Sequence, residues 1–448
     1  MRDTQAKINE LESKDHSLQI YTAWEHVNFV QLENQLGKAD LYDGMTIHPY
    51  SGTVNESSDE AYLLDAMRRA DGCRTKVEDY LRQMPDDKVP AISEFGIYYN
   101  TSGRTRSQLH ALYVARCIMD YAELGSPYIQ KHCLSDYYTS GADALGPTQQ
   151  AVIQVVASNG ADTATGKGDF GYFATPSAHV FQIFNSGFGT ELLESSLSQD
   201  YTLSNGVSAL SVLASRDEDD NYSIALTNAE PSLSHTVQIR LPEGTDLSRE
   251  GLKVKVQRLE SDQLAAENSL DNPDHVSVSV DEAVVAEDGS VYVTVAPHSF
   301  AIVRIYVPSD KEVLEDLIDT ANSITTDESA KFTDLRNRLS QAERTEANEF
   351  ARQALVDKKV DQLEYALRQL LDPALLDTAI TKAEALDLSH FALETEKILN
   401  EALALARQVR TSALRQAEID EAARMLNTTL LELRLMPDPA LLSQLSES

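Results

Sequence analysis

The chain has 448 residues, room for about two to four domains, and its 42% hydrophobic content is enough for buried cores. Lys and Arg total 38 against 71 Asp and Glu, and the resulting net charge of −33 argues against nucleic acid or an anionic membrane as a partner. The cysteines, Cys73, Cys117 and Cys133, lack the spacing of a zinc site or a disulfide framework. No zinc site is therefore expected from them, and the sequence implies no other metal and no organic cofactor. No apolar run is long enough to span a membrane, and residues 1–17 lack the apolar core of a secretory signal peptide.

Residues 1–145 alternate short apolar runs with helical periodicity, which is the pattern of βα units. Expected strands are 18–23, 41–50, the run that ends at Glu94, and 128–134, and expected helices are 27–36, 61–84 and 109–124. A closed (β/α)₈ barrel takes eight strands and about 250 residues. We therefore predict the C-terminal half of such a barrel, and a chain that is a fragment of a longer protein.

Residues 146–307 are predicted to form an antiparallel β-sandwich or jelly roll, because short alternating runs recur between turn sequences. The expected strands are 180–184, 208–214, 222–227, 236–241, 252–259, 275–280, 291–295 and 300–307.

From residue 308 onward glycine disappears and the chain becomes rich in helix-forming residues. Apolar positions recur in two segments: Ile318, Ala321 and Ile324 match Ile380, Ala383 and Leu386, and Leu335, Leu339 and Ala342 match Leu399, Leu403 and Ala406. We predict two three-helix-bundle repeats, residues 308–371 and 372–436. Neither carries a chemical motif, so an interaction or spacer role is expected.

One constellation of residues could carry chemistry. Glu94 follows an apolar run and precedes Gly96, so it is expected at the carboxyl end of a buried parallel strand, where barrel enzymes place catalytic groups. His48 and Tyr50 end the preceding strand and share a face. A tyrosine hydroxyl beside a carboxylate would orient it as a nucleophile. His132, on the fourth expected strand, would face the same opening. In the alternative interpretation His48 and Tyr50 satisfy loop backbone groups.

Several motifs, in order, resemble the α-L-arabinofuranosidases of glycoside hydrolase family 51. They are 46–50 (TIHPY), 93–96 (SEFG), 181–184 (FQIF), 210–214 (LSVLA) with 224–228 (IALTN), and 295–300 (VAPHSF). The resemblance implies a retaining glycosidase acting on arabinose-containing polysaccharides or oligosaccharides. It also implies that Glu94 is the catalytic nucleophile, that His48 belongs to the substrate site and that Tyr50 there supports the nucleophile. The assignment of His132 to the substrate site rests on the expected strand register.

The sequence departs from the family at the acid/base residue. The family places this glutamate in an Asn-Glu pair, and no such pair with the right topology precedes His48; Glu25 lies after the first expected strand and is not assigned. The chain alone is therefore expected to hydrolyse glycosides poorly, or to be a non-catalytic carbohydrate-binding or adhesion module. The helical segment resembles the FIVAR-type repeats of secreted bacterial glycosidases, which implies an extracellular or cell-surface parent protein.

Overall fold

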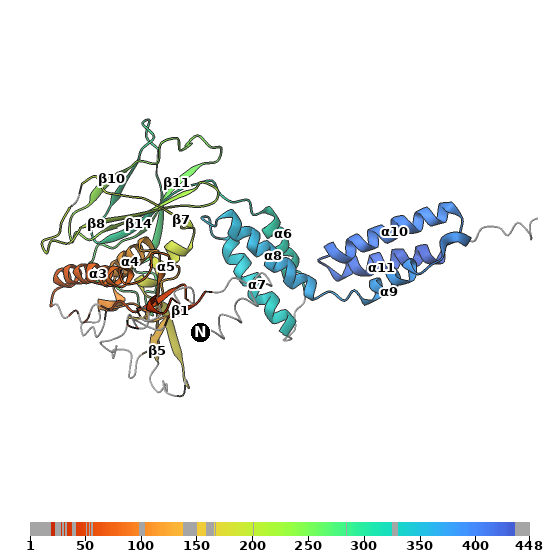
Figure 1. Ribbon diagram of the computed structural model, residues 1–448, viewed down its shortest axis with the longest axis horizontal. Coiled ribbons are helices and arrows are strands. Elements are labelled where there is room, and N and C mark those ends of the chain that lie inside the picture. Colours follow the sequence, from red (N-terminus) through yellow and green to blue (C-terminus); the bar gives the residue numbers. More distant parts are fainter. Residues whose placement is uncertain are drawn as a thin grey trace, which may run out of the picture. The chain divides into compact units, whose positions relative to one another are not determined.

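The computed structural model describes residues 19–22, 28, 31, 34–37, 42–50, 52, 54, 57–97, 104–137, 150–157, 165, 167–199, 201–283, 285–324 and 330–434. The chain divides into two compact units, Met1–Pro308 and Ser309–Ser448. The first combines helices with parallel and antiparallel sheets, whereas the second is helical (Figure 1).

A small parallel sheet opens the first unit. It contains β1 (Tyr21–Thr22), β2 (Gly44–Ile47) and β3 (Val89–Ile92) in that order, and α3 (Asp59–Leu81) connects β2 to β3. Neighbouring parallel strands need a crossover connection of about a dozen residues or more, and α3 provides it. Helix α4 (Gln108–Glu123) follows β3. The prediction of alternating strands and helices is confirmed here, although the helix expected at 27–36 lies mostly outside the described residues.

The fourth expected strand, 128–134, is wrong as a strand. Ile129 forms only an isolated parallel bridge with Ile92, and the backbone N–H groups of Gln130 and His132 donate to the carbonyls of Ile92 and Phe95 at 2.8 and 3.0 Å. The segment runs beside β3 without completing a ladder. Within the described residues the parallel strands do not close into a barrel.

An antiparallel sheet forms the centre of the first unit. It has six strands in the order β12 (Val278–Glu282), β11 (Lys253–Leu259), β14 (Ser299–Tyr306), β9 (Tyr222–Asn228), β8 (Leu210–Arg216) and β7 (Glu191–Leu193). A two-stranded sheet, β10 (His235–Ile239) with β13 (Val291–Val295), packs on one face. These strands match seven of the eight expected segments. Of these, β12 begins three residues later than the expected strand 275–280.

The central strands β9 and β14 are buried along their whole length because both faces of the sheet are covered. Ile224 and Val303 belong to the core shared with β10 and β13, whereas their neighbours Ala225 and Ile302 belong to the core shared with the helices. Successive residues of a strand point to opposite faces, so each strand serves two cores.

Helix α5 (Pro176–Asn185) occupies the place where the sequence predicted a strand at 180–184, and that prediction is wrong. Its buried Val180 and Ile183 are three residues apart, as on one side of a helix. The guanidinium of Arg304, a fully buried residue of β14, donates to the Ile183 carbonyl and, at 3.1 Å, to Ser186 Oγ at the helix C-terminus, where a cation is favoured. Burial lowers the pKa of Arg304 to about 9.

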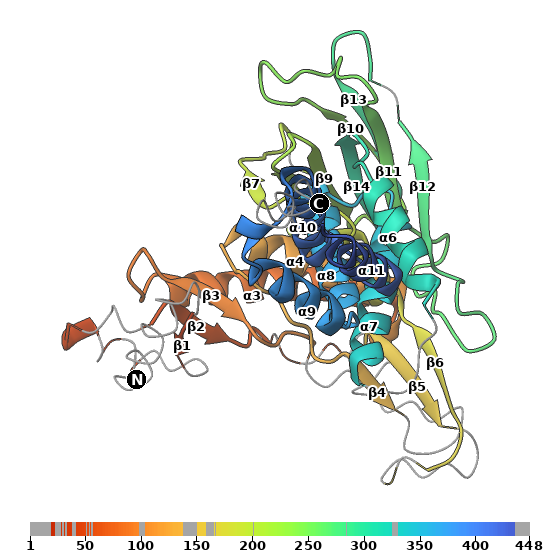
Figure 2. The ribbon, with the colours of Figure 1, turned by 90° about the vertical axis from the view of Figure 1, so that its right-hand side faces the viewer.

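A third sheet was not predicted. It contains β4 (Ser135–Tyr137), β5 (Ile153–Ala157) and β6 (Phe170–Ala174), of which β5 and β6 are antiparallel and lie side by side in Figure 2. The run 151–157 (AVIQVVA), rich in β-branched residues, is a strand signal that the prediction overlooked, whereas the three residues of β4 are too short to show a pattern.

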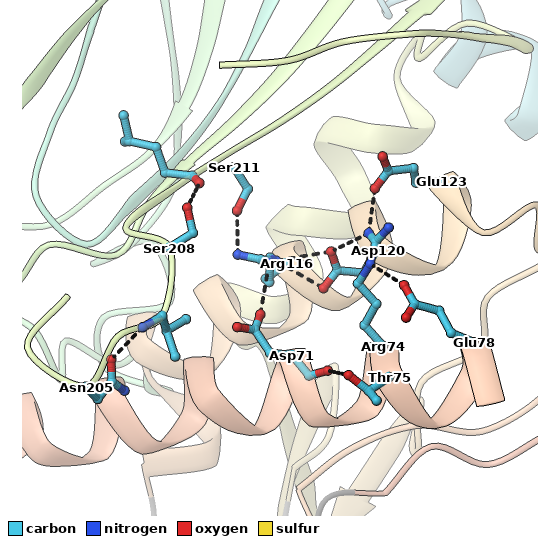
Figure 3. Close-up of polar contacts among 12 residues, drawn as sticks. Asp71, Arg74, Thr75, Glu78, Arg116, Asp120, Glu123, Asn205, Ser208 and Ser211 are labelled. Carbon is cyan, nitrogen blue, oxygen red and sulfur yellow. Dashed lines mark hydrogen bonds and ion pairs between the residues drawn. The ribbon is translucent and has the colours of Figure 1, made fainter. Parts of the chain in front are cut away.

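A network of charged side chains joins α3, α4 and β8 (Figure 3). Asp120 is 5% exposed and accepts two hydrogen bonds from Arg116 Nε and one from Arg74 Nη1, at 3.0 to 3.2 Å. Arg116 also donates to Asp71 of α3 and to Ser211 of β8, at 2.9 and 2.6 Å. The network therefore fastens the helices that follow the parallel strands to the central antiparallel sheet.

The second unit contains two groups of three helices, each with its own core. The first group is α6 (Glu312–Asn322), α7 (Ala330–Glu346) and α8 (Gln353–Gln369); the second is α9 (Ala374–Glu384), α10 (Leu393–Ser412) and α11 (Gln416–Leu431). In each group every helix packs on the other two. None of the helices that the structure describes is both long enough and apolar enough to cross a membrane.

Candidate functional site

The candidate site lies where β2 and β3 end. Ile47 and Ile92, the last residues of these parallel strands, are in register. The residues that follow them, 48–50 and 93–95, therefore leave the sheet side by side at its carboxyl edge. This register brings together three of the four side chains that the sequence singled out.

Glu94 is the centre of the site. Tyr50 Oη donates a short hydrogen bond to Glu94 Oε1, and His48 Nδ1 lies 3.7 Å from Glu94 Oε2. The side chains of His48 and Glu94 are 23% and 34% exposed, so a ligand in solution can reach the carboxylate. The tyrosine fixes one oxygen, which leaves the other turned toward the histidine. This is the orientation that a nucleophilic carboxylate requires.

The 48–50 segment is held in place by its neighbours. His48 Nε2 lies 2.9 Å from Ser93 Oγ, and Lys76 Nζ donates to the His48 carbonyl at 3.2 Å. The Cys73 thiol, buried on α3, donates to the Pro49 carbonyl at 2.8 Å. Since one ring nitrogen of His48 is engaged by Ser93, the other is directed to Glu94. Both Lys76 and Cys73 belong to the helix that connects the two strands.

Behind Glu94 the chain is fixed from the other side by Gln150. Gln150 Oε1 accepts a hydrogen bond from the Ile97 backbone at 3.1 Å, and a Cβ atom on Gly96 would lie 2.4 Å from the same oxygen. Glycine is thus the residue that fits between the Glu94 loop and Gln150. Buried Phe95 packs edge-to-face on Tyr121 of α4, with ring centroids 5.6 Å apart.

Sequence reasoning missed Gln150 and Ser93. Gln150 lies 53 residues from its partner Ile97 and belongs to no pattern, so only Gly96 hinted that something approaches closely. His132 is a different case: its backbone donates to Phe95, but its ring is exposed and the described contacts of Glu94 come from Tyr50 and His48. A substrate role for His132 stays a prediction.

The second carboxyl group of a glycosidase is not identified. Glu25, which the sequence left unassigned, lies outside the described residues. Among the residues that the structure does describe, no cluster of three or more His, Cys, Asp or Glu side chains is arranged to hold a metal ion.

Residues 151–299 match the family profile of the alpha-L-arabinofuranosidase C-terminal domain. The resemblance to the arabinofuranosidases is confirmed for this segment. It covers β5 to β13 together with α5, that is, most of the antiparallel part of the first unit. No curated protein sequence matches the chain.

Among solved structures, similar chains include the family 51 arabinofuranosidase of Xanthomonas axonopodis pv. citri, at 18% identity and a TM-score of 0.47 over 63% of this chain and 57% of that one. The thermostable family 51 α-L-arabinofuranosidase of Thermotoga petrophila has 15% identity and a TM-score of 0.47 over 67% of this chain and 60% of that one. The Thermotoga maritima enzyme, in complex with arabinose, has 16% identity and a TM-score of 0.45, with coverage of 66% and 59%. The chain thus spans less than two thirds of each of these proteins.

Proposed function

We propose that this chain is part of a retaining glycosidase that cleaves terminal α-L-arabinofuranosyl residues, with Glu94 as the nucleophile. The support for it is the arrangement at the carboxyl edge of the parallel sheet, where Tyr50 holds one oxygen of a solvent-accessible carboxylate and His48 lies 3.7 Å from the other. The match of the adjoining segment to the arabinofuranosidase C-terminal domain supports the choice of sugar class.

In the proposed reaction an oxygen of Glu94 attacks the anomeric carbon, and the leaving-group oxygen takes the electrons of the glycosidic bond and a proton. Water then attacks the same carbon and gives up a proton to the unassigned acid/base carboxylate, and the bond between this carbon and the Glu94 oxygen breaks to release the sugar and the free Glu94 carboxylate. The hydrogen bond from Tyr50 keeps the nucleophile in position, and His48 and His132 are proposed to contact the sugar. The reaction needs no metal or cofactor.

We further propose that β1, β2 and β3 are consecutive parallel strands of the second half of a (β/α)₈ barrel, and that the segment at Ile129, which forms a single bridge with Ile92, lies where the next strand would be. Such a barrel has eight strands, and its acid/base carboxyl comes from a strand of the other half. We assign no acid/base residue in this chain. The helical unit is proposed to be a FIVAR-type interaction or spacer segment of a cell-surface or secreted protein.

The test uses a substrate that does not need an acid. In 2,4-dinitrophenyl α-L-arabinofuranoside the leaving group departs as a stable anion, so little general acid catalysis is required. Wild-type protein should release dinitrophenol, and Glu94→Gln should reduce the rate by at least about a thousandfold. Glu60→Gln, which changes an exposed carboxylate at the start of α3, is the matched control and should act like wild type. Equal rates in wild-type and Glu94→Gln protein would contradict the assignment.

The same substrate distinguishes the alternative function, a carbohydrate-binding module without catalysis. Such a module would bind arabinose-containing oligosaccharides, release no dinitrophenol above the uncatalysed rate, and bind equally well after Glu94→Gln.

A further inference from the structure

The two groups of three helices are structural repeats, and equivalent residues in them make the same hydrogen bonds. In the first, Gln353 Oε1 accepts from the Asp310 backbone at 2.8 Å and Gln353 Nε2 donates to the Asp310 carbonyl at 3.1 Å. In the second, Gln416 makes the same two bonds with Asp372 at 2.7 and 3.0 Å. Each glutamine also donates to an aspartate four residues on, Asp357 or Asp420. Positions can therefore be matched residue by residue between the groups.

The second repeat contacts the first through the turn between α10 and α11. Leu414 in this turn packs on the core of the first repeat, which includes Ile324, Leu367 and Leu370. Arg415 Nη2 donates to Thr320 Oγ1 at 3.1 Å. Thr320 and Leu367 are accordingly buried, at 8% and 0% exposure. We call this pair, Leu414 and Arg415, the docking turn.

No residue among those described in 330–434 covers the matching surface of the second repeat. Lys382 corresponds to Thr320 and is exposed, and Leu430 corresponds to Leu367 and is only half-buried. These residues line a hollow of about 730 Å³ together with Leu386, Asp387, Phe391 and Leu433. Leu386 and Leu433 correspond to Ile324 and Leu370 of the first repeat. Leu414 and Arg415 cover this surface in the first repeat. In the second repeat the corresponding surface is an open apolar hollow.

We propose that this hollow is the docking site of another three-helix repeat of the same kind, which enters it with its own docking turn. The leucine of that turn would pack between Leu386, Leu430 and Leu433. In the first repeat the arginine of the docking turn donates to Thr320, but the corresponding residue of the second repeat is Lys382, which cannot accept this hydrogen bond. The incoming arginine would pair instead with the exposed carboxylate of Asp387 at the rim of the hollow.

A repeated sequence motif indicates the kind of occupant. Residues 438–442 read Asp-Pro-Ala-Leu-Leu, identical to residues 372–376, which form the start of the second repeat. In that repeat Asp372 is the residue held by Gln416, and Leu376 is fully buried in the core. The five residues that begin the second repeat therefore occur again, directly after the repeat that carries the open hollow.

The test adds the occupant to the full chain. Residues 1–439 are followed by a copy of residues 374–434, and backbone hydrogen exchange is measured by mass spectrometry at the C-terminal ends of α9 and α11. We expect exchange there to slow by about tenfold, the factor that corresponds to 1.4 kcal/mol of added local stability. The control carries alanine in place of the copied Leu414 and Arg415 and should return exchange to the rate of the 448-residue protein.

The native junction serves as the positive control. In the 448-residue protein, Leu414→Ala with Arg415→Ala should accelerate exchange at the C-terminal end of α6, next to Thr320. The proposal is overturned if the added copy leaves exchange around the hollow unchanged, whether or not circular dichroism shows the copy to be helical. It is also overturned if the protection persists in the alanine control.

Discussion

Asp120 offers a quantitative test of how the first unit is held together. The substitution Asp120→Asn keeps the shape of the side chain but removes its negative charge. Arg116 and Arg74 donate their hydrogen bonds to this charged carboxylate. Removing one partner of a buried ion pair usually costs about 3–5 kcal/mol, because the other charge is left buried and unpaired.

The structure argues for a cost below that range. Arg116 keeps its ion pair with Asp71 at 2.9 Å, and Arg74 keeps Glu78 at 3.0 Å as well as Glu123. Neither guanidinium is left without a carboxylate, and the asparagine carbonyl can still accept one hydrogen bond. We therefore expect the free energy of unfolding of the first unit to fall by about 2–3 kcal/mol.

Native-state hydrogen exchange at the buried α4 amides is the suitable assay, because it reports the opening of the first unit separately from the helical unit. The matched control is Glu123→Gln, which removes a carboxylate that is 53% exposed and should cost less than about 1 kcal/mol. A loss below about 1 kcal/mol for Asp120→Asn, equal to that of the control, would refute the view that this network fastens α3 and α4 to the sheet.

Three further predictions follow from other parts of the molecule. Gly96→Ala should destabilise the first unit by about 1–3 kcal/mol, because the added Cβ would clash with Gln150 Oε1. Adding Gln150→Ala should recover part of this loss, which urea unfolding of the single and double variants would measure. Burial holds the pKa of His110 well below 6.5, so the folded state keeps a neutral ring while the unfolded chain takes up a proton. Stability should therefore fall by about 1.4 kcal/mol per pH unit below pH 6.5, and His110→Phe should remove this slope from a series of denaturation curves. Gln353→Ala should release the start of α6 and speed amide exchange near Asp310, whereas the exposed substitution Gln341→Ala should not.

The sequence allowed the candidate site to be predicted because its signal is local. Glu94 follows an apolar run and His48 and Tyr50 follow another, and once two such strands are parallel neighbours their ends must meet. The supporting contact from Gln150 could not be predicted, because it depends on where the chain returns after the 138–149 segment that lies outside the described residues. The prediction for His132 assumed that residues 128–134 form a strand in register with β3. Ile129 forms only a single bridge, which does not extend a strand register to His132.

The error at α5 has a physical explanation in the residues themselves. Val180, Phe181, Ile183 and Phe184 form a short apolar run, which fits a buried strand as well as a helix. Pro176 is the better indicator, because proline at the first turn of a helix loses no hydrogen bond. By contrast, β13 was predicted at its observed bounds, since its alternating pattern of buried and exposed residues shows one solvent-facing side.

The most direct measurement of the central claim is the covalent intermediate itself. The account predicts that mixing the protein with 2,4-dinitrophenyl α-L-arabinofuranoside and quenching in acid leaves the mass of one pentosyl residue on the peptide that contains Glu94. Because dinitrophenolate is a good leaving group, this intermediate should form faster than water hydrolyses it, and it should therefore accumulate. It should be absent in Glu94→Gln and present in Glu60→Gln. An unmodified Glu94 peptide in the wild-type protein, or the same adduct in the Glu94→Gln protein, would contradict the assignment of the nucleophile.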